Sequence, residues 1–173
     1  MAHAAVHDTH DTHDHKPQGF LHRWLFTTNH KDIGTLYLVF ALIMFFTGGS
    51  MAMIIRAELF EPGMQLVQPE FFNQMTTVHA LVMIFGAVMP AFVGLGNWMI
   101  PLQIGAPDMA LPRMNNWSFW IMPFAFSMLL MTLFLPGGGP ASGWTLYPPL
   151  SLQGGYHIAF TILAIHMMGV SSI

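Results

Sequence analysis

The sequence predicts an all-α membrane protein, a transmembrane helical bundle, from two observations. Only 8 % of the 173 residues are charged and 54 % are hydrophobic, whereas a soluble domain has roughly a quarter charged residues. The apolar residues also gather in four long runs separated by polar or glycine-rich connections. Because each run is too long for a strand, and lipid offers no hydrogen-bond partner to a backbone, we expect helices.

The apolar runs have the length of membrane-spanning helices. They cover about residues 34–56, 75–100, 117–135 and 156–173. The first carries no charge over 22 positions, from Gly34 to Ile55, which is enough to cross a hydrocarbon layer of about 30 Å. Pro90 and Pro123 lie inside the second and third runs, where we expect them to kink the helices. The fourth run stops at Ile173 before any interfacial residue, which indicates a portion of a longer protein.

Two segments precede the first run. Residues 1–19 are rich in His and Asp and lack the apolar residues that a core needs, so we expect a disordered cytoplasmic tail with incidental metal binding. Residues 20–33 are amphipathic, which indicates a segment lying in the membrane interface. Trp24 is expected at headgroup level, with Arg23 and Lys31 reaching water.

The few charged residues predict an orientation and exclude several functions. Lys16, Arg23, Lys31 and Arg113 lie on one side of the expected bundle, and Arg56 lies on the other. This bias places the N-terminus in the cytoplasm. A net charge of −3 with scattered basic residues excludes a nucleic-acid footprint. The lack of cysteine excludes disulfides, thiolate zinc sites and iron–sulfur clusters.

His79 is the one ionisable residue in the second run. A buried ionisable group in a membrane is costly and indicates a function, here as a metal or haem ligand. A neutral imidazole bonded to a neighbouring helix is an equally good interpretation. On a helix, Val82, Met83 and Gly86 share the face of His79. That face is apolar and includes one residue without a side chain, as a flat macrocycle requires.

Arg56, Glu58 and Glu61 follow the first run on the outer side. Arg56 either forms an interfacial ion pair or donates hydrogen bonds to an electronegative cofactor group. Glu58 and Glu61, with Gly63 and Gln65, offer oxygen ligands for Ca²⁺ or Na⁺, although such turns are common without a metal.

Asp108 lies in the inner connection between the second and third runs. Asn97 and Asn115 flank it at the inner ends of those runs. A carboxylate that leads to uncharged amides is what a water-filled proton path requires. Taken alone, Asp108 is more simply a solvated loop carboxylate.

Several stretches resemble the large subunit of the haem–copper oxidases, both in their sequence and in their order along the chain. They are TTNHKDIGTLYL (27–38), IRAEL (55–59), HALVMIFGAVMPAFVGLGNWMIPLQIGAPDMALPRMNNWSFW (79–120), GWTLYPPL (143–150) and HMMGVSSI (166–173). The resemblance implies a bundle of about twelve transmembrane helices, of which this chain holds the first four. It also implies a respiratory enzyme that reduces O₂ to water with electrons from cytochrome c or quinol and pumps protons.

The resemblance implies haem-binding roles for several residues. His79 matches an axial ligand of the family's low-spin haem, which we expect to be haem a. Arg56 matches the arginine that contacts the formyl group of this haem. Trp144 resembles a tryptophan near the haem, and we expect Met83 beside the cofactor as well.

An outer cation site and a proton path are also implied. The family's Ca²⁺ or Na⁺ lies in a position similar to Glu58, Glu61, Gly63 and Gln65. Its proton entrance matches Asp108. The polar lining of its proton path resembles Asn97, Asn115, Tyr37, Ser171 and Ser172. A high-spin haem and copper are expected in the complete subunit with ligands beyond Ile173, so we expect that this chain alone cannot reduce O₂.

We therefore expect part of a catalytic oxidase subunit in a bacterial inner (plasma) membrane. Its expected partners are the remainder of the large subunit, oxidase subunits II and III, membrane lipid and the donor cytochrome c, with no nucleic acid. The sequence of residues 56–59 and 105–116 favours cytochrome c over quinol as the electron donor. A quinol oxidase and a cofactor-free membrane assembly protein remain alternatives. A metal transporter fits poorly, because the runs hold no pair of ligands at metal-binding spacing.

Overall fold

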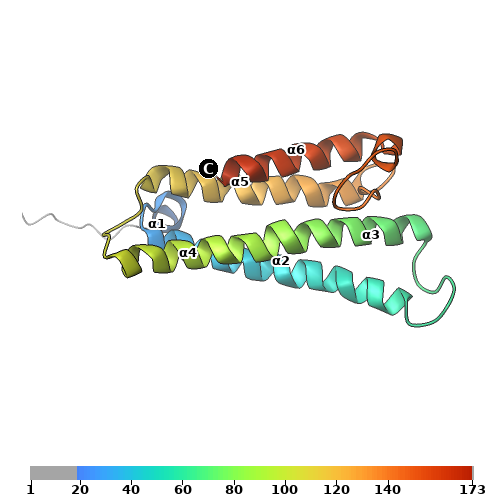
Figure 1. Cartoon of the computed structure of the whole chain (residues 1–173), viewed down its shortest axis with the longest axis horizontal. Helices are drawn as coiled ribbons and strands as arrows, with labels where there is room; N and C mark the ends of the chain where they lie inside the picture. The colour runs from blue at the N-terminus through green and yellow to red at the C-terminus, as the bar shows by residue number, and fades with distance from the viewer. Residues whose placement is uncertain (1–18, 173) are drawn as a thin grey trace, which may run out of the picture.

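The structure is a computed structural model that describes residues 19–172 (Figure 1). The elements in order are α1 (Phe20–Phe26), α2 (His30–Glu58), α3 (Pro69–Leu81), the π-helix η1 (Val82–Val88), α4 (Met89–Ile104), α5 (Pro112–Met131), the 3₁₀ turns η2 (Thr132–Phe134) and η3 (Leu150–Gln153), and α6 (Tyr156–Ser171). The predicted all-α membrane fold is confirmed within the described residues. The predicted tail lies outside them except for Gly19, as does Ile173.

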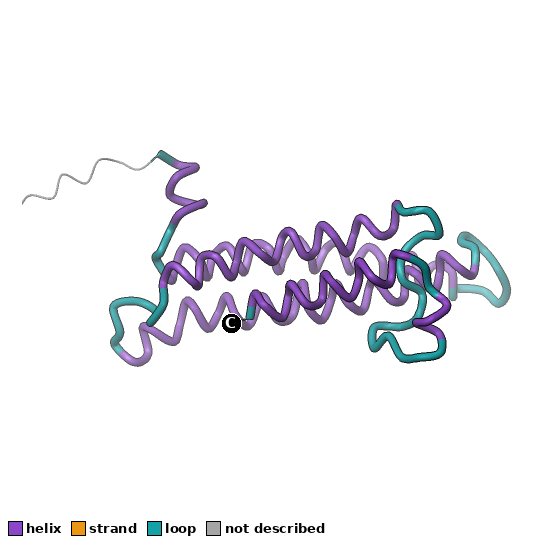
Figure 2. Tube along the Cα trace, turned by 90° about the horizontal axis from the view of Figure 1, so that it is seen from above, coloured by secondary structure: helices purple, strands orange, loops and turns teal. Residues whose placement is uncertain are grey.

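The long helices lie side by side as two antiparallel pairs (Figures 1 and 2). In the first pair, α2 packs along the continuous helix formed by α3, η1 and α4; in the second, α5 packs along α6. The pairs meet mainly through α2 and α5. Connections 59–68 and 135–155 lie at one end of the bundle, which corresponds to the predicted outer side (Figure 1). Connection 105–111 and α1 lie at the other, inner end.

Two glycines let the helices of the first pair approach closely. A Cβ built on Gly34 would lie 2.8 Å from the carbonyl oxygen of Gly94, and one on Gly94 would lie 2.9 Å from the carbonyl oxygen of Gly34. A side chain at either position would therefore clash with backbone that cannot give way. Small residues at such crossings are the usual basis of close helix packing in membranes.

Aromatic side chains join the two pairs in the middle of the bundle. Tyr37 and Phe40 of α2 pack edge-on against Phe119 of α5, with ring centroids 5.1 and 6.4 Å apart. Phe40 also packs against Phe126 at 5.5 Å. All four side chains are buried. Edge-to-face aromatic pairs contribute about 0.5–1.5 kcal/mol each beyond their buried area, so these contacts hold the pairs together.

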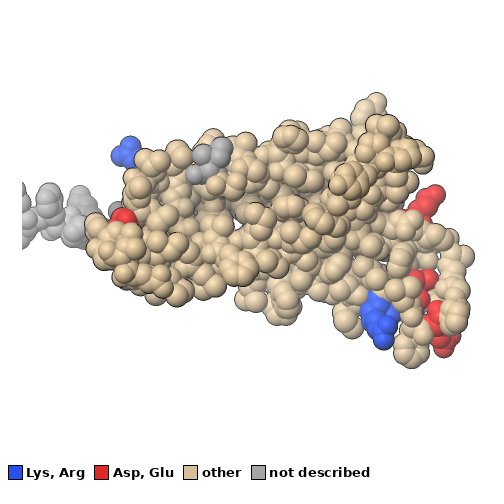
Figure 3. Space-filling view, in the orientation of Figure 1, with Lys and Arg blue, Asp and Glu red and all other residues tan. Residues whose placement is uncertain are grey.

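The exterior has the character of a membrane protein. Helices His30–Glu58, Pro69–Ile104 and Pro112–Phe134 are long and apolar enough to cross a membrane, and α6 is a shorter apolar helix of 16 residues. Large apolar side chains point outward from them, as at Phe92, which is 71 % exposed. Figure 3 shows the charged groups gathered at the two ends of the long axis, with none in the middle of that face.

The first long helix begins earlier than the apolar run predicts. The Asn29 side chain accepts a hydrogen bond from the amide of Lys31 and so caps α2 at His30. Residues 30–33 therefore belong to a long helix and not to the segment before it. Of the predicted interfacial segment, only α1 forms a separate helix.

Side chains of α5 and α2 hold α1 at the inner end. The Asn116 side-chain amide donates to the carbonyl oxygens of Thr27 at 2.6 Å and Leu25 at 3.1 Å. Arg23 of α1 forms an ion pair with Asp32 at 2.9 Å. The link between α1 and α2 is thus tied to both helix pairs.

Neither predicted kink residue ends its helix. Pro123 lies inside α5, and Pro90 is the second residue of α4, just after η1. A π-helix bonds residues five apart instead of four, so η1 changes which side chains share a face after His79. This has a consequence at Gly86, described below.

Candidate functional site

His79 of α3 is half-buried and faces α2. Its Nδ1 lies 2.9 Å from the main-chain carbonyl oxygen of Gly48. A carbonyl oxygen only accepts, so Nδ1 carries the hydrogen, and in the neutral ring Nε2 keeps a free lone pair. No hydrogen bond from the described residues reaches Nε2. One ring nitrogen thus fixes the direction of the imidazole and the other is available to a ligand.

Gly48 also provides space beside His79. A Cβ built on Gly48 would lie 2.6 Å from Sδ and 2.9 Å from Cγ of Met83. Met83 therefore packs against bare backbone of α2, one helical turn after His79. Both side chains contact the same residue of α2.

Gly86 does not provide the open face that the sequence predicts. A Cβ there would lie 2.8 Å from the ring of Phe126 and 3.1 Å from Met44. These side chains fill the space, because Gly86 lies in η1 and faces α5 as well as α2. The prediction of room for a macrocycle at Gly86 is therefore wrong.

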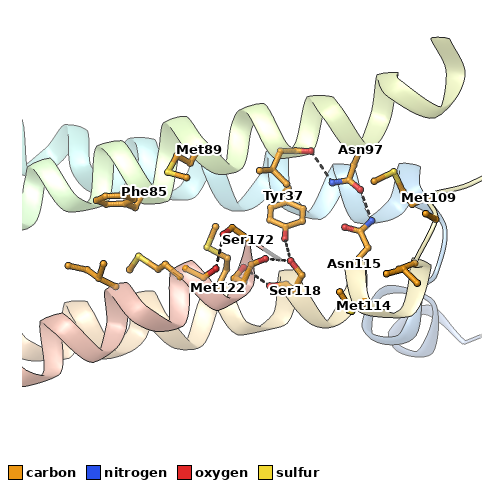
Figure 4. A pocket seen from close by; sticks show the side chains of 17 residues that line it. Tyr37, Phe85, Met89, Asn97, Met109, Met114, Asn115, Ser118, Met122 and Ser172 are labelled. Atoms are coloured by element: carbon orange, nitrogen blue, oxygen red, sulfur yellow. Dashed lines mark hydrogen bonds between the residues drawn. The ribbon is translucent and has the colours of Figure 1, made fainter. Parts of the chain in front are cut away.

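A cavity of about 480 Å³ lies between the two helix pairs (Figure 4). Its inner part is lined by amides and hydroxyls, and its deeper part by apolar side chains such as Phe85, Met89 and Met122 (Figure 4). The lining includes every predicted polar residue of the proton path except Asp108: Tyr37, Asn97, Asn115, Ser171 and Ser172. Residues from four different helices therefore meet at one cavity.

Hydrogen bonds divide the polar lining into two groups (Figure 4). At the inner end, the Asn115 side chain donates to Oδ1 of Asn97 at 2.5 Å. Deeper, the hydroxyls of Tyr37 and Ser118 lie 3.0 Å apart, and Ser118 also donates to the carbonyl of Ser171. The hydroxyl of Ser171 donates back to the Ser118 carbonyl at 2.7 Å. An amide pair and a hydroxyl group thus follow one another along the cavity.

Asp108 lies beside the cavity and not in its lining. It is half-buried, and its Oδ1 accepts a hydrogen bond from the amide of Met109 at 2.7 Å. Met109 itself lines the inner end of the cavity (Figure 4). Nearby in the fold, buried His30 donates from Nδ1 to the carbonyl of Asn97 at 2.8 Å. The inner end therefore combines a carboxylate, an imidazole and two amides.

The outer connection 59–68 folds over the carboxylate of Glu58. Glu58 is buried, and its Oε1 accepts from the amide of Gln65 at 2.9 Å. Its Oε2 accepts from the amides of the next two residues, at 2.6 and 3.0 Å. Glu61 and Gly63 line an open cavity together with Glu58. The four predicted cation residues are thus neighbours, but both oxygens of Glu58 already bind amides.

Arg56 and Trp144 lie toward the outer end. Arg56 is exposed and forms no ion pair with the residues that the structure describes. The neighbouring Glu58 is occupied by amides, so the ion-pair interpretation of Arg56 finds no partner here. Trp144 is 48 % exposed. Its chain neighbour Gly143 donates an amide hydrogen bond to Oγ1 of Thr77, at 3.0 Å, which ties this connection to the helix that carries His79.

The other described membrane histidines do not build a metal centre. His166 is exposed and its Nδ1 lies 2.8 Å from the carbonyl of Ile162 in its own helix. Within residues 19–172, no three His, Asp or Glu side chains come together.

Ser118 and Gly48 are two site residues absent from the sequence prediction. Ser118 follows Asn115 by three positions, so helical periodicity alone would have placed both on one face. Gly48 lies in a Thr-Gly-Gly-Ser stretch inside an otherwise apolar run. That stretch signals close packing, but it does not indicate which helix approaches.

Comparison with known proteins identifies the family. The family described as Cytochrome C and Quinol oxidase polypeptide I matches residues 32–173. The chain is 41 % identical to cytochrome c oxidase subunit 1 of Cereibacter sphaeroides, across 100 % of the chain and 36 % of that relative. It is 44 % identical to cytochrome c oxidase subunit 1 of Mytilus edulis, across 87 % of the chain and 28 % of the relative. For the probable cytochrome c oxidase subunit 1-alpha of Streptomyces avermitilis, the values are 45 %, 79 % and 24 %.

The chain spans about a third or less of the length of these curated relatives. The matched family region contains His79 with its partner Gly48 and the cavity between the helix pairs. The apolar helices agree with a multi-pass membrane protein. The chain belongs to the cytochrome c and quinol oxidase polypeptide I family.

Proposed function

We propose that this chain is part of the catalytic subunit of a terminal respiratory oxidase, which oxidises cytochrome c, reduces O₂ to water and pumps protons. The family and the names of the relatives support this class of enzyme. We assign to this portion one axial ligand of a low-spin haem and the entry of a proton path. The observation that carries the assignment is the hydrogen bond between His79 and Gly48, which leaves Nε2 available to iron.

The proposed role of His79 is to hold a neutral imidazole in a fixed direction. Two features support a fit to haem. The ring belongs to a membrane helix and is half-buried, and its Nδ1–H donates a hydrogen bond to the Gly48 carbonyl. A haem iron with two imidazole ligands has no open position and therefore supplies electron transfer and not O₂ binding. A backbone acceptor at Nδ1, the ring nitrogen that does not bind iron, fixes the tautomer and raises the basicity of the ligand.

Three further residues are proposed to contact this haem, which we take to be haem a. Met83 is supported by its packing beside His79 on Gly48. Arg56 is supported by an exposed guanidinium that pairs with no described carboxylate. Trp144 is supported by its anchored connection and exposed indole. The high-spin haem and copper of the complete subunit take their ligands from elsewhere.

The cavity between the helix pairs is proposed as the entry of the proton path. Asp108 provides a carboxylate at its inner end, and the amide pair Asn97 and Asn115 follows. Water beside the polar residues of this cavity can connect these groups to the hydroxyls of Tyr37 and Ser118. Ser171 and Ser172 complete the polar lining from α6.

The proposed setting is a bacterial inner membrane with the N-terminus in the cytoplasm. Arg23 lies on α1, and Lys31 and Arg113 lie in the first turns of α2 and α5, all at the inner end. Arg56 lies in the last turn of α2, at the outer end. This distribution supports the orientation. Exposed apolar side chains on α1 support an interfacial position for that helix; they are Phe20, Leu21, Leu25 and Phe26. The remainder of subunit I, subunits II and III, lipid and cytochrome c are the proposed partners.

An outer Ca²⁺ or Na⁺ is a separate part of the proposal. Glu61 and the main chain near Gly63 face an open cavity of about 660 Å³ and can supply oxygen ligands. Glu58 would contribute only lone pairs left over from its amide hydrogen bonds, and Gln65 is held beside it. A quinol donor in place of cytochrome c is the alternative, since the family description names both enzymes.

The test is the absorption spectrum of the complete oxidase carrying His79→Ala. We expect the low-spin haem bands to disappear, because the variant lacks the imidazole that we propose as an axial ligand. His166→Ala is the matched control, since His166 is exposed and bonds only within its own helix. Retention of the low-spin bands in His79→Ala would refute the ligand assignment. A complex that assembles without colour in the wild type would favour the cofactor-free assembly protein.

A further inference from the structure

We infer that Gly48 is a positioning residue for His79: its carbonyl selects the ring tautomer, and its missing side chain sets the packing of Met83 beside the ring. The inference rests on the proposed haem ligation for its purpose. It concerns only this chain's own residues, so it can be tested without haem.

The tautomer argument starts from the chemistry of the contact. A neutral imidazole carries its hydrogen on either Nδ1 or Nε2, and the two forms have similar energy in water. The Gly48 carbonyl, 2.9 Å from Nδ1, accepts but cannot donate. It therefore favours the form with hydrogen on Nδ1 and leaves the Nε2 lone pair free.

A second histidine shows that this contact is not a general property of helices. His166 places its Nδ1 2.8 Å from the carbonyl of Ile162, four residues earlier in the same helix. His79 instead reaches a residue 31 positions away, on a different helix. The direction of the His79 ring therefore depends on how α2 packs against α3, and so on what occupies position 48.

Position 48 tolerates no side chain without a rearrangement beside His79. A methyl group there would lie 2.6 Å from Sδ of Met83 and 3.3 Å from Cγ1 of Val82. Val82 is fully buried, while Met83 is half-buried and flexible. Met83 must move and Val82 must shift by a few tenths of an ångström, which changes the packing beside the His79 ring. The next residue, Gly49, meets nothing within 4 Å.

Adjacent glycines with opposite surroundings give a matched pair of variants. Gly48→Ala and Gly49→Ala make the same chemical change at neighbouring positions and gain the same helix propensity, about 1 kcal/mol. Only Gly48→Ala crowds Met83. The double variant Gly48→Ala with Met83→Ala removes the two closest contacts, and like the single variant it keeps the carbonyl at position 48.

The measurement is ¹⁵N NMR of the histidine rings in the full chain, reconstituted in lipid nanodiscs, with His79→Gln to assign the signal. We expect His79 to be protonated on Nδ1 in the wild type and in Gly49→Ala. Gly48→Ala should lose most of that signal, and the double variant should regain it. Equal signals in Gly48→Ala and Gly49→Ala would overturn the inference. If Gly48→Ala does not fold, the double variant decides, because loss of the Nδ1–H signal there contradicts the role of the carbonyl.

A second readout in the complete oxidase separates this inference from the haem assignment. A weaker hydrogen bond at Nδ1 makes the imidazole less basic and stabilises ferric iron less. We therefore expect a more positive midpoint potential of the low-spin haem in Gly48→Ala and no shift in Gly49→Ala. If His79→Ala keeps its low-spin haem, the ligand assignment fails while the NMR result stands. If His79→Ala loses that haem but both alanine variants behave alike, only the positioning role of Gly48 fails.

Discussion

The contact within the first helix pair and the contact between the two pairs are built in opposite ways. Within the first pair, α2 meets α3, η1 and α4 through bare backbone at Gly34, Gly48 and Gly94. Between the pairs, α2 and α5 meet through large aromatic side chains beside a cavity of about 480 Å³. Close backbone contact fixes the direction of one imidazole, whereas the contact between the pairs leaves a cavity with both polar and apolar lining. The difference indicates that one bundle combines a fixed imidazole with an open cavity.

The largest effect is expected from a side chain in the close contact of the first pair. Gly94→Val places a Cβ 2.9 Å from the carbonyl oxygen of Gly34, so α2 and α4 must separate. Overpacking of this kind costs about 1–3 kcal/mol or more. Thermal unfolding in lipid nanodiscs measures it. Gly96→Val is the control, because the nearest atom to its Cβ is an ordinary contact at 3.5 Å. Equal destabilisation by the two variants would show that the close crossing is not needed.

Removal of charge at the inner end of the cavity is expected to act on proton uptake and not on haem. Asp108→Asn keeps the shape of the side chain but removes the carboxylate that we propose as the proton entrance. We expect proton uptake by the complete oxidase to slow by about tenfold or more, with low-spin haem bands unchanged. Glu70→Gln, at an exposed position on the outer side, should leave both unaffected. Unchanged uptake in Asp108→Asn would remove Asp108 from the path.

A smaller effect is expected from the hydroxyl group between the pairs. Tyr37→Phe removes the 3.0 Å hydrogen bond to Ser118 while keeping the ring that packs on Phe119. Loss of one buried hydrogen bond costs about 1 kcal/mol. Chemical unfolding of the full chain measures the difference. Tyr147→Phe, at a residue 72 % exposed, should cost nothing measurable. An unchanged free energy of unfolding in Tyr37→Phe would mean that water replaces the hydroxyl in the cavity.

The smallest and most local effect is expected at the outer connection. Glu58→Gln keeps one acceptor oxygen but loses the charge that strengthens its bonds to the amide of Gln65 and its two successors. Hydrogen exchange at those three amides should accelerate, with little change in global stability. Glu61→Gln, which bonds none of these amides, is the control. If Ca²⁺ slows exchange in the wild type but not in Glu61→Gln, the outer cation proposal gains support.

Much of the fold followed from the sequence, because lipid permits few structures. Apolar runs with few charges predicted an all-α bundle, and the resemblance to the haem–copper oxidases pointed to five polar residues that the fold brings to one cavity. The details that failed depend on packing between helices. The open face at Gly86 was wrong because η1 breaks the ordinary helical spacing. The partner of His79 was not predictable, because nothing in a Thr-Gly-Gly-Ser stretch says which helix lies against it.

The central claim is that Nε2 of His79 binds the iron of the low-spin haem. The most direct test is pulsed electron paramagnetic resonance of the complete oxidase carrying His79→Gly, supplied with ¹⁵N-imidazole. We expect low-spin haem to be lost without imidazole and to return with imidazole, together with a ¹⁵N hyperfine coupling to the ferric iron. A low-spin signal that persists in His79→Gly without imidazole would contradict this claim.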